Sequence, residues 1–307
     1  MRPAIPPNVV LLLLHEWRWS AAGFLGDVNA RTPHLDAIAA RGTTASHARV
    51  ASLDPGENRH ALLSRVGEVA TAAGYDTMAA GCFDHRLPAS GYERVSRCEP
   101  TPADDTPAHV WTGFGAGRSP LPEGEHPVGR TGGEAVRLLR TAREPFLLAV
   151  PFPAPATPLD PPAPWDRLLR PDLLAMPKGF ALPARAANEA YPVDFETMTE
   201  ARFRKYLACY HGMLGFIDHQ VGRILGTLAA RGFGRTVLVA TASSGHYLGD
   251  EGRTARERDP APMEALLRVP LLAAGLPGFE PGDRPFHAEA LAGLLCALMA
   301  PVDEAEA

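Results

Sequence analysis

The chain has 307 residues, of which 46% are hydrophobic and 21% are charged, so it is long and apolar enough to bury a sizeable core. This composition excludes a chain that is disordered throughout. The net charge of -5 and the pI near 6.1 argue against a nucleic-acid partner, because proteins that bind phosphate backbones through electrostatics are usually basic.

Cysteine content and hydrophobic runs indicate the compartment. The four cysteines, Cys82, Cys98, Cys209 and Cys296, form no C-x-x-C pair, and we expect reduced thiols or semi-buried packing residues. The apolar run at residues 11–14 is too short to span a membrane, and no hydrophobic stretch precedes a cleavage site. We therefore expect a soluble, cytoplasmic protein without a membrane partner. The oligomeric state is not indicated.

The first expected elements lie before residue 100. The continuous apolar run at residues 8–14 predicts a buried parallel strand. Thr32 and Pro33 open a helix that ends before Gly42, because threonine caps helices and proline is tolerated at the first helical position. Next in order we expect a helix over residues 61–73 and a short strand over 76–81.

The middle and C-terminal parts alternate between loop-rich and periodic segments. Residues 100–133 are rich in Pro, Gly, Thr and Asp, which predicts a loop or insertion. After a helix at 133–143 and a strand at 146–152, the Pro-dense segment 151–171 predicts extended loop, because proline cannot donate to a strand ladder. The remaining expected elements are a long helix over residues 196–231, strands over 236–241 and 271–274, and a helix over 287–299.

Strands that alternate with helices predict an α/β fold with a mostly parallel sheet covered on both faces. We expect one domain over residues 1–307, with loop-rich insertions at 100–133 and 151–195.

Several short sequence blocks occur along the chain, and their order is more specific than any single block. The strand at 8–14 ends in His15 and Glu16, and TPHLDAIAARG follows at residues 32–42. A third block is AGY at residues 73–75 with Gly81, and a fourth is PFLLAV at 145–150, followed by TP at 157–158 and DPP at 160–162. The last two are IDHQVGRIL at 217–225, followed by TVLVAT at 236–241, and LRVPL at 267–271. In this order they resemble the type I sulfatase family, a branch of the alkaline phosphatase superfamily. The resemblance implies a three-layer α/β/α sandwich, and we expect the family's small C-terminal subdomain to be lacking.

The resemblance also implies a nucleophile and metal ligands, and the sequence departs from both. The family's formylglycine motif, Cys/Ser-x-Pro/Ala-x-Arg, falls on residues 55–59, where Pro55 stands at the nucleophile position and only Arg59 is retained. The family's metal-binding pair falls on Ser243 and Ser244, and serine is a poor ligand for hard divalent metals. The matched positions of further site residues are Cys82 and Asp84, with His85 adjacent, Ala156, and a position near Asp259. Sulfatase activity by the family mechanism is therefore not expected.

Three hypotheses describe what the cleft could do instead. In the first, His15, Glu16 and His246 form a remodelled Zn or Fe(II) site. Residues that could complete it are Asp84, His85, Asp250 and His60. The simpler interpretation is that His15 and Glu16 are hydrogen-bonded polar groups at the mouth of a cleft, because adjacent strand residues point to opposite faces.

The second hypothesis is a non-catalytic pocket for a carboxylate, sulfate or phosphate, formed by Arg59, His60, Ser243, Ser244 and a helix N-terminus. The simpler interpretation is that Arg59 pairs with Glu57 or Asp54. The third hypothesis is an interaction protein that uses segments 100–133 and 151–171 as contact surfaces, although both can be plain surface loop. Trp17 and Trp19 could line a pocket near His15, but burial against the sheet is the simpler interpretation.

The sequence thus predicts a degenerate sulfatase-like pseudoenzyme that binds a polar or anionic ligand or a partner protein. The predicted cleft residues are His15, Glu16, Arg59, His60, Asp84, His85, Ser243, Ser244 and His246. No cofactor is expected. The alternative is a repurposed enzyme, a hydrolase or a metal-dependent enzyme, that uses His15, Glu16 and His246 and binds Zn or Fe(II).

Overall fold

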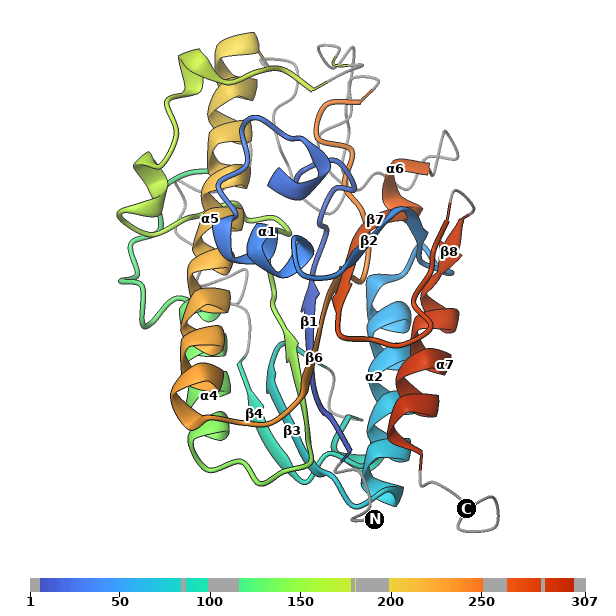
Figure 1. Cartoon of the computed structure of the whole chain (residues 1–307). Coiled ribbons are helices and arrows are strands. Elements are labelled where there is room, and N and C mark those ends of the chain that lie inside the picture. The colour runs from blue at the N-terminus through green and yellow to red at the C-terminus, as the bar shows by residue number, and fades with distance from the viewer. Residues whose placement is uncertain are drawn as a thin grey trace.

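The computed structural model describes residues 6–83, 87–98, 116–177, 180, 199–250, 264–282 and 285–300. Among these residues, a sheet of eight strands forms the centre of the molecule (Figure 1). The strands are β1 (Asn8–Leu14), β2 (Thr43–Arg49), β3 (Asp76–Gly81), β4 (Arg94–Arg97), β5 (Phe146–Pro151), β6 (Thr236–Ala242), β7 (Arg268–Ala274) and β8 (Phe286–His287). The α-helices are α1 (Pro33–Ala39), α2 (Pro55–Ala72), α4 (Pro127–Arg140), α5 (Glu200–Arg231), α6 (Glu264–Leu267) and α7 (Ala288–Met299). The 3-10 helices are η1 (Gly23–Leu25), η2 (Leu87–Ser90), η4 (Trp165–Arg167) and η5 (Pro171–Leu173).

The strand order is β4-β3-β5-β1-β6-β7-β2-β8, with β1 in the interior of the sheet. β1 pairs in parallel with β5 on one side and with β6 on the other, and all seven of its residues are buried. Both faces of this strand are covered, which explains why its sequence is continuously apolar rather than alternating. β7 runs antiparallel to both β6 and β2, so the sheet is mostly parallel, as expected, but carries one reversed strand.

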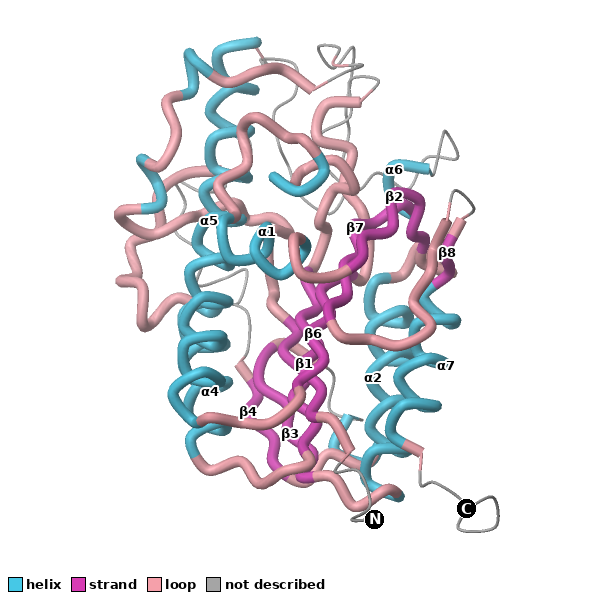
Figure 2. The backbone as a smooth tube through the Cα atoms, in the orientation of Figure 1, coloured by secondary structure: helices cyan, strands magenta, loops and turns pink. Residues whose placement is uncertain are grey.

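The helices form two layers on opposite faces of the sheet, which confirms the expected three-layer α/β/α arrangement. Helices α1, α4 and α5 lie on one side, and α2 and α7 pack together on the other (Figures 1 and 2). The long helix α5 begins after Thr199, whose side chain accepts a hydrogen bond from the amide of Arg202, and ends at Gly232 in the left-handed conformation.

Two helices begin earlier than the apolar periodicity predicts. α2 starts at Pro55 rather than near residue 61, and α4 starts at Pro127, inside a segment expected to be loop. Each begins with proline at its first position, and each is capped by a side chain, Asp54 for α2 and His126 for α4. In the segment 151–171, Pro151 ends β5 and Pro171 begins η5, and the residues between them are loop as expected except for the short turn η4.

Two further expectations concern the tryptophans and membrane spans. Trp17 is fully buried and its indole N–H donates to the carbonyl of Ala21 at 2.8 Å, so burial is the correct interpretation for this residue. Trp19 is half-buried and lines a cavity described below. Within the described ranges, no helix combines the length and the apolar character that crossing a bilayer requires.

Candidate functional site

The carboxyl ends of the central parallel strands meet at one edge of the sheet. The amide of Ser243, just after β6, donates to the carbonyl of Leu14 at 2.9 Å, and the amide of His15 donates to the carbonyl of Ala154 at 3.0 Å. Ligand sites of open α/β sheets form outside this edge. The structure therefore brings the segments that carry His15, Glu16 and Ser243 together where the sequence predicts a cleft.

His15 and Glu16 come together because the chain turns sharply after β1. Glu16 has a φ of 61°, a left-handed conformation that is uncommon for a residue other than glycine. Its Oε1 lies 4.0 Å from Nε2 of His15, and the side chains of His15 and Glu16 are 24% and 12% exposed, respectively. The rule that adjacent residues point to opposite faces holds only within a strand, so it does not separate this pair. The carbonyl of Glu16 accepts a hydrogen bond from the hydroxyl of Tyr210 at 2.9 Å.

The two serines after β6 are buried rather than open to the cleft, each being only 1% exposed. The hydroxyl of Ser243 lies 3.4 Å from the carbonyl of Leu14, and that of Ser244 has no hydrogen-bond partner among the described residues. Hard divalent cations prefer several carboxylate or carbonyl oxygens. The donors that His15, Glu16 and the two serines offer therefore do not fit the divalent metal that the family resemblance implies.

The N-terminus of α2 approaches this edge through Asn58. The side-chain amide of Asn58 donates to the carbonyl of Ser243 at 2.9 Å and to that of Ser52 at 2.6 Å. The first turn of the helix is already capped, because the carboxylate of Asp54 accepts from the amides of Gly56 at 2.7 Å and Glu57 at 3.3 Å. An external anion would have to displace this carboxylate before it could use those amides.

Arg59 is not held by the acids that its sequence neighbours offer. The carboxylate of Glu57 accepts from the hydroxyl of Ser52 at 2.6 Å, and Asp54 is used as the cap. The expected pairing of Arg59 with either acid is therefore wrong, and the half-buried Arg59 makes no ion pair with a described residue. His60 contacts Ser64 at 3.4 Å, one turn further along α2. Two predicted site residues, Asp84 and His85, lie outside the described residues.

Both ring nitrogens of His246 are in contact with neighbouring polar groups. Its Nδ1 accepts from the amide of Leu248 at 2.9 Å, and its Nε2 lies 3.1 Å from the hydroxyl of Tyr206. Burial, with the nearby Arg18 charge, lowers the pKa of His246 to about 3, so the ring is neutral at neutral pH. The described part of the chain contains no group of three or more His, Cys, Asp or Glu side chains arranged to hold a metal.

Sequence reasoning missed a buried ion pair between Arg18 and Asp250. Nη1 and Nη2 of Arg18 lie 2.6 and 2.9 Å from the two carboxylate oxygens of Asp250, and the arginine side chain is 5% exposed. Nη1 also donates to the carbonyl of Tyr247, and Nε donates to the hydroxyl of Ser20 at 2.7 Å. This bidentate pair ties the segment after β1 to the segment after β6. The signal available in the sequence was an arginine flanked by two tryptophans directly after a buried strand.

A cavity of about 730 Å³ lies next to this ion pair. Its walls include Arg18, Trp19, Asp27, His211, Asp250 and Arg268. Of the residues predicted for the cleft or its remodelled metal site, Asp250 contributes to these walls, as does Trp19, which the sequence suggested for a pocket near His15. His15, Glu16, Arg59, His60, Ser243, Ser244 and His246 do not line this cavity.

The chain is similar in sequence to sulfatases and similar in fold to a phosphonate monoester hydrolase. No protein-family model matches the chain. It is 23% identical over 333 residues to a sulfatase of Formosa agariphila, covering 88% of this chain and 64% of that protein. It is 27% identical over 168 residues to an arylsulfatase of Clostridium perfringens, covering 52% of this chain and 33% of that protein. The chain thus spans less than two thirds of the length of these curated relatives. The phosphonate monoester hydrolase of Agrobacterium radiobacter superposes with a TM-score of 0.71 at 20% identity, covering 95% of this chain and 73% of that one.

Proposed function

We propose that this chain, which belongs to the type I sulfatase branch of the alkaline phosphatase superfamily, binds a polar or anionic ligand in its cleft without cleaving it. The observation that carries the proposal is Pro55 at the first position of α2. This position matches the family's nucleophile, and proline has no atom that could attack sulfur or phosphorus. Loss of the nucleophile alone lowers turnover by roughly 10⁴–10⁶-fold in analogous hydrolases.

The charges at this edge of the sheet argue against group transfer. Transfer of a sulfuryl or phosphoryl group needs cations that neutralise the developing negative charge. Here Asp54 caps the helix N-terminus, and Glu16 brings a second carboxylate to the end of β1. Arg59 is the cation that a bound anion would meet, while His15 and Glu16 offer hydrogen bonds to polar groups of the same ligand.

The proposal is tested by assaying the purified protein on 4-nitrophenyl sulfate, 4-nitrophenyl phosphate and a phosphonate monoester, each with added Mg²⁺, Ca²⁺, Mn²⁺ or Zn²⁺. We expect the rate to equal that of a Glu16→Gln variant, because the residual activity would come from contaminants. The matched control is Glu125→Gln, at an exposed position far from the cleft in sequence. Turnover that falls in Glu16→Gln and persists in Glu125→Gln would contradict the proposal.

The alternative is a repurposed enzyme with a metal bound by His15, Glu16 and His246. For His246 to bind a metal, it would have to release either Tyr206 or the amide of Leu248. Metal analysis of the purified protein separates the two proposals. A stoichiometric transition metal that is lost in both His15→Ala and His246→Ala would favour the enzyme. Co-purification of a second protein, without metal, would favour a role as a partner subunit.

A further inference from the structure

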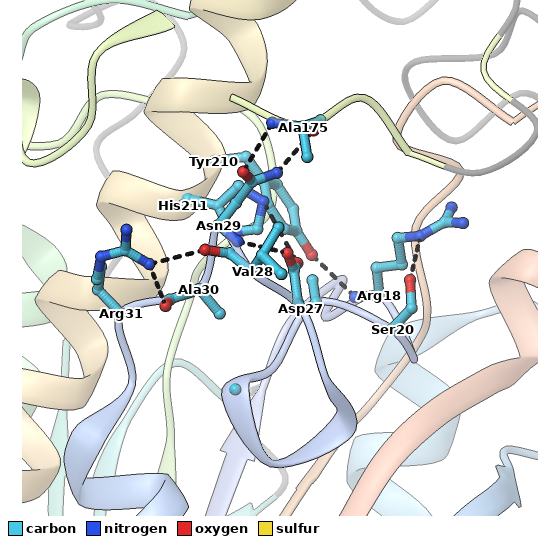
Figure 3. Close-up of polar contacts among 12 residues, drawn as sticks. Arg18, Ser20, Asp27, Val28, Asn29, Ala30, Arg31, Ala175, Tyr210 and His211 are labelled. Carbon is cyan, nitrogen blue, oxygen red and sulfur yellow. Dashed lines mark hydrogen bonds and ion pairs between the residues drawn. The ribbon is translucent and has the colours of Figure 1, made fainter. Parts of the chain in front are cut away.

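The cavity beside the Arg18–Asp250 pair is lined by other residues than His15, Glu16, Arg59 and the two serines of the predicted cleft. It lies between the segment that includes η1, the middle of α5 and residues 175–177. Figure 3 shows Asp27 and Asn29 on this segment facing α5 and Ala175. The side-chain amide of Asn29 donates to the carbonyl of Ala175 at 2.8 Å and accepts from its amide at 3.0 Å. The wall is therefore held in place by hydrogen bonds.

The cavity wall carries a cation, Arg268, that forms no ion pair with any described residue. The guanidinium carbon of Arg268 lies 3.7 Å from the centre of the Trp19 ring, and Nε and Nη2 donate to the carbonyl of Ser46 at 3.1 and 2.6 Å. Among the described residues, Arg268 has no ion-pair partner, and the nearby Glu264 is paired with Arg49. Burial lowers the pKa of Arg268, and the charges of Arg49 and Arg18 act in the same direction, against the opposing effect of Glu264. A bound anion would stabilise the charged form of Arg268 and so offset the free-energy cost of burying its guanidinium group.

The wall also carries a carboxylate, Asp27, that forms no ion pair with a described Arg or Lys side chain. Oδ2 of Asp27 lies 3.6 Å from Nε2 of His211, and Oδ1 accepts from the amide of Asn29 at 2.9 Å. Burial lowers the pKa of His211 to about 4, so its ring is neutral at neutral pH and supplies no positive charge to Asp27. Nδ1 of His211 is buried and has no hydrogen-bond partner among the described residues. Asp27 and His211 therefore offer acceptors to a donor group.

Apolar side chains line the cavity between these charged groups. They include Leu25, Val28, Met176 and Leu207. Val28 is 70% exposed, which is rare for a large hydrophobic residue of this protein. An apolar ligand body would cover this surface, and removing apolar area from water favours binding.

We propose that this cavity binds a small zwitterionic molecule with an apolar body, whose anionic group pairs with Arg268 beside Trp19 and whose ammonium group is bound by Asp27 and His211. The bidentate Arg18–Asp250 pair forms part of the wall and is already saturated by its own contacts. The inference concerns a cavity outside the inherited cleft, so it stands whether or not that cleft hydrolyses esters.

The test is calorimetric titration of the full chain with ω-amino acids, 6-aminohexanoate and 8-aminooctanoate, and with two one-ended probes, octanoate and octylamine. We expect at least one ω-amino acid to bind roughly ten-fold more tightly than either one-ended probe, because each charged end adds a charge-assisted hydrogen bond. This comparison uses the unmodified protein and therefore does not depend on any variant folding correctly. Absence of ω-amino acid binding, or equal affinity for all probes, would overturn the proposal.

Two variants test which residue binds which charged end of the ligand. Arg268→Met should remove the advantage of the ω-amino acid over octylamine, and Asp27→Asn should remove its advantage over octanoate. The matched controls are Arg167→Met and Asp172→Asn, whose side chains are 81% and 60% exposed away from the cavity walls. Unchanged affinity in both cavity variants, or equal losses in the controls, would place the ligand elsewhere and refute the assignment.

Discussion

His211 and His246 are two histidines that the fold keeps neutral. Both are 1% exposed, and burial is the main cause that lowers the pKa of His211 to about 4 and that of His246 to about 3. A sequence motif cannot reveal this, because the same imidazole at the surface would titrate near its ordinary value. For His246, the position after β6 indicated reactivity, whereas its two nitrogens serve to hold the local backbone and Tyr206.

The buried His211 predicts a specific acid sensitivity. The pKa of His211 is lower in the folded chain than in the unfolded chain. On acidification, His211 is therefore protonated in the unfolded chain at a pH where it is still neutral in the folded chain. The free energy of unfolding should therefore fall as the pH decreases from about 6.5 towards 4, by about 2 kcal/mol between pH 7 and pH 5 from this residue. Urea unfolding at several pH values measures the slope.

In His211→Phe this contribution should disappear, which leaves the similar contribution of His246. His47→Gln, at an exposed position, is the control and should keep the full slope. A slope that is the same in the unmodified protein and in His211→Phe would show that His211 is not held neutral.

Helix packing explains where the secondary elements depart from simple periodicity. α4 packs closely against α5, and its first turn contains Pro127 and glycine rather than a clear apolar stripe. Its start is set by His126, which accepts from the amide of Val128 at 3.2 Å while its other nitrogen lies 3.3 Å from Asp160. The proline at the first helical position was a readable signal. A histidine cap is not among the preferred caps, and its partner Asp160 is distant in sequence.

Adjacent glycines of α4 give a matched test of this packing. A Cβ on Gly132 would lie 2.4 Å from Oε1 of Gln220 and 2.7 Å from its Cβ, whereas a Cβ on Gly133 would meet no atom within 4 Å. Gly132→Ala should lower the free energy of unfolding by about 1–3 kcal/mol through overpacking against α5. Gly133→Ala should raise it by about 0.5–1 kcal/mol, because alanine favours a helix more than glycine does. Chemical denaturation measures both, and equal effects would contradict the close α4–α5 approach.

At the scale of the whole molecule, the sheet brings the ends of distant segments to one edge. β1 lies between β5 and β6, so the residues that follow these three strands become neighbours although they are far apart in the chain. These residues offer the two buried hydroxyls of Ser243 and Ser244, the imidazoles of His15 and His246, and the carboxylate of Glu16. We therefore expect that the stability of this sulfatase-like scaffold does not depend on a hard divalent metal.

Metal addition tests this directly. After treatment with a chelator, 1 mM Ca²⁺ or Mg²⁺ should leave the midpoint of thermal unfolding unchanged. An ion that bound only the folded state with a Kd of about 10 µM would add about 2.7 kcal/mol under these conditions, a shift that calorimetry detects easily. Stabilisation by Ca²⁺ or Mg²⁺ that is lost in Glu16→Gln would contradict the expectation. Stabilisation by Zn²⁺ alone, lost in His15→Ala, would support the remodelled site.

The sequence by itself determined the fold class and most of the core. The apolar runs at residues 8–14, 146–151 and 236–242 encode strands buried on both faces, and such burial leaves a local pattern that can be read without any partner. The polar strand β2 was missed because its residues do not alternate, and the reversed direction of β7 leaves no trace in periodicity. Tertiary structure alone decided which charges meet. Arg18 and Asp250 form an ion pair although they are 232 residues apart in the chain. Burial in the folded chain lowers the pKa values of His211 and Arg268, and the charged groups that act on them come near only through folding.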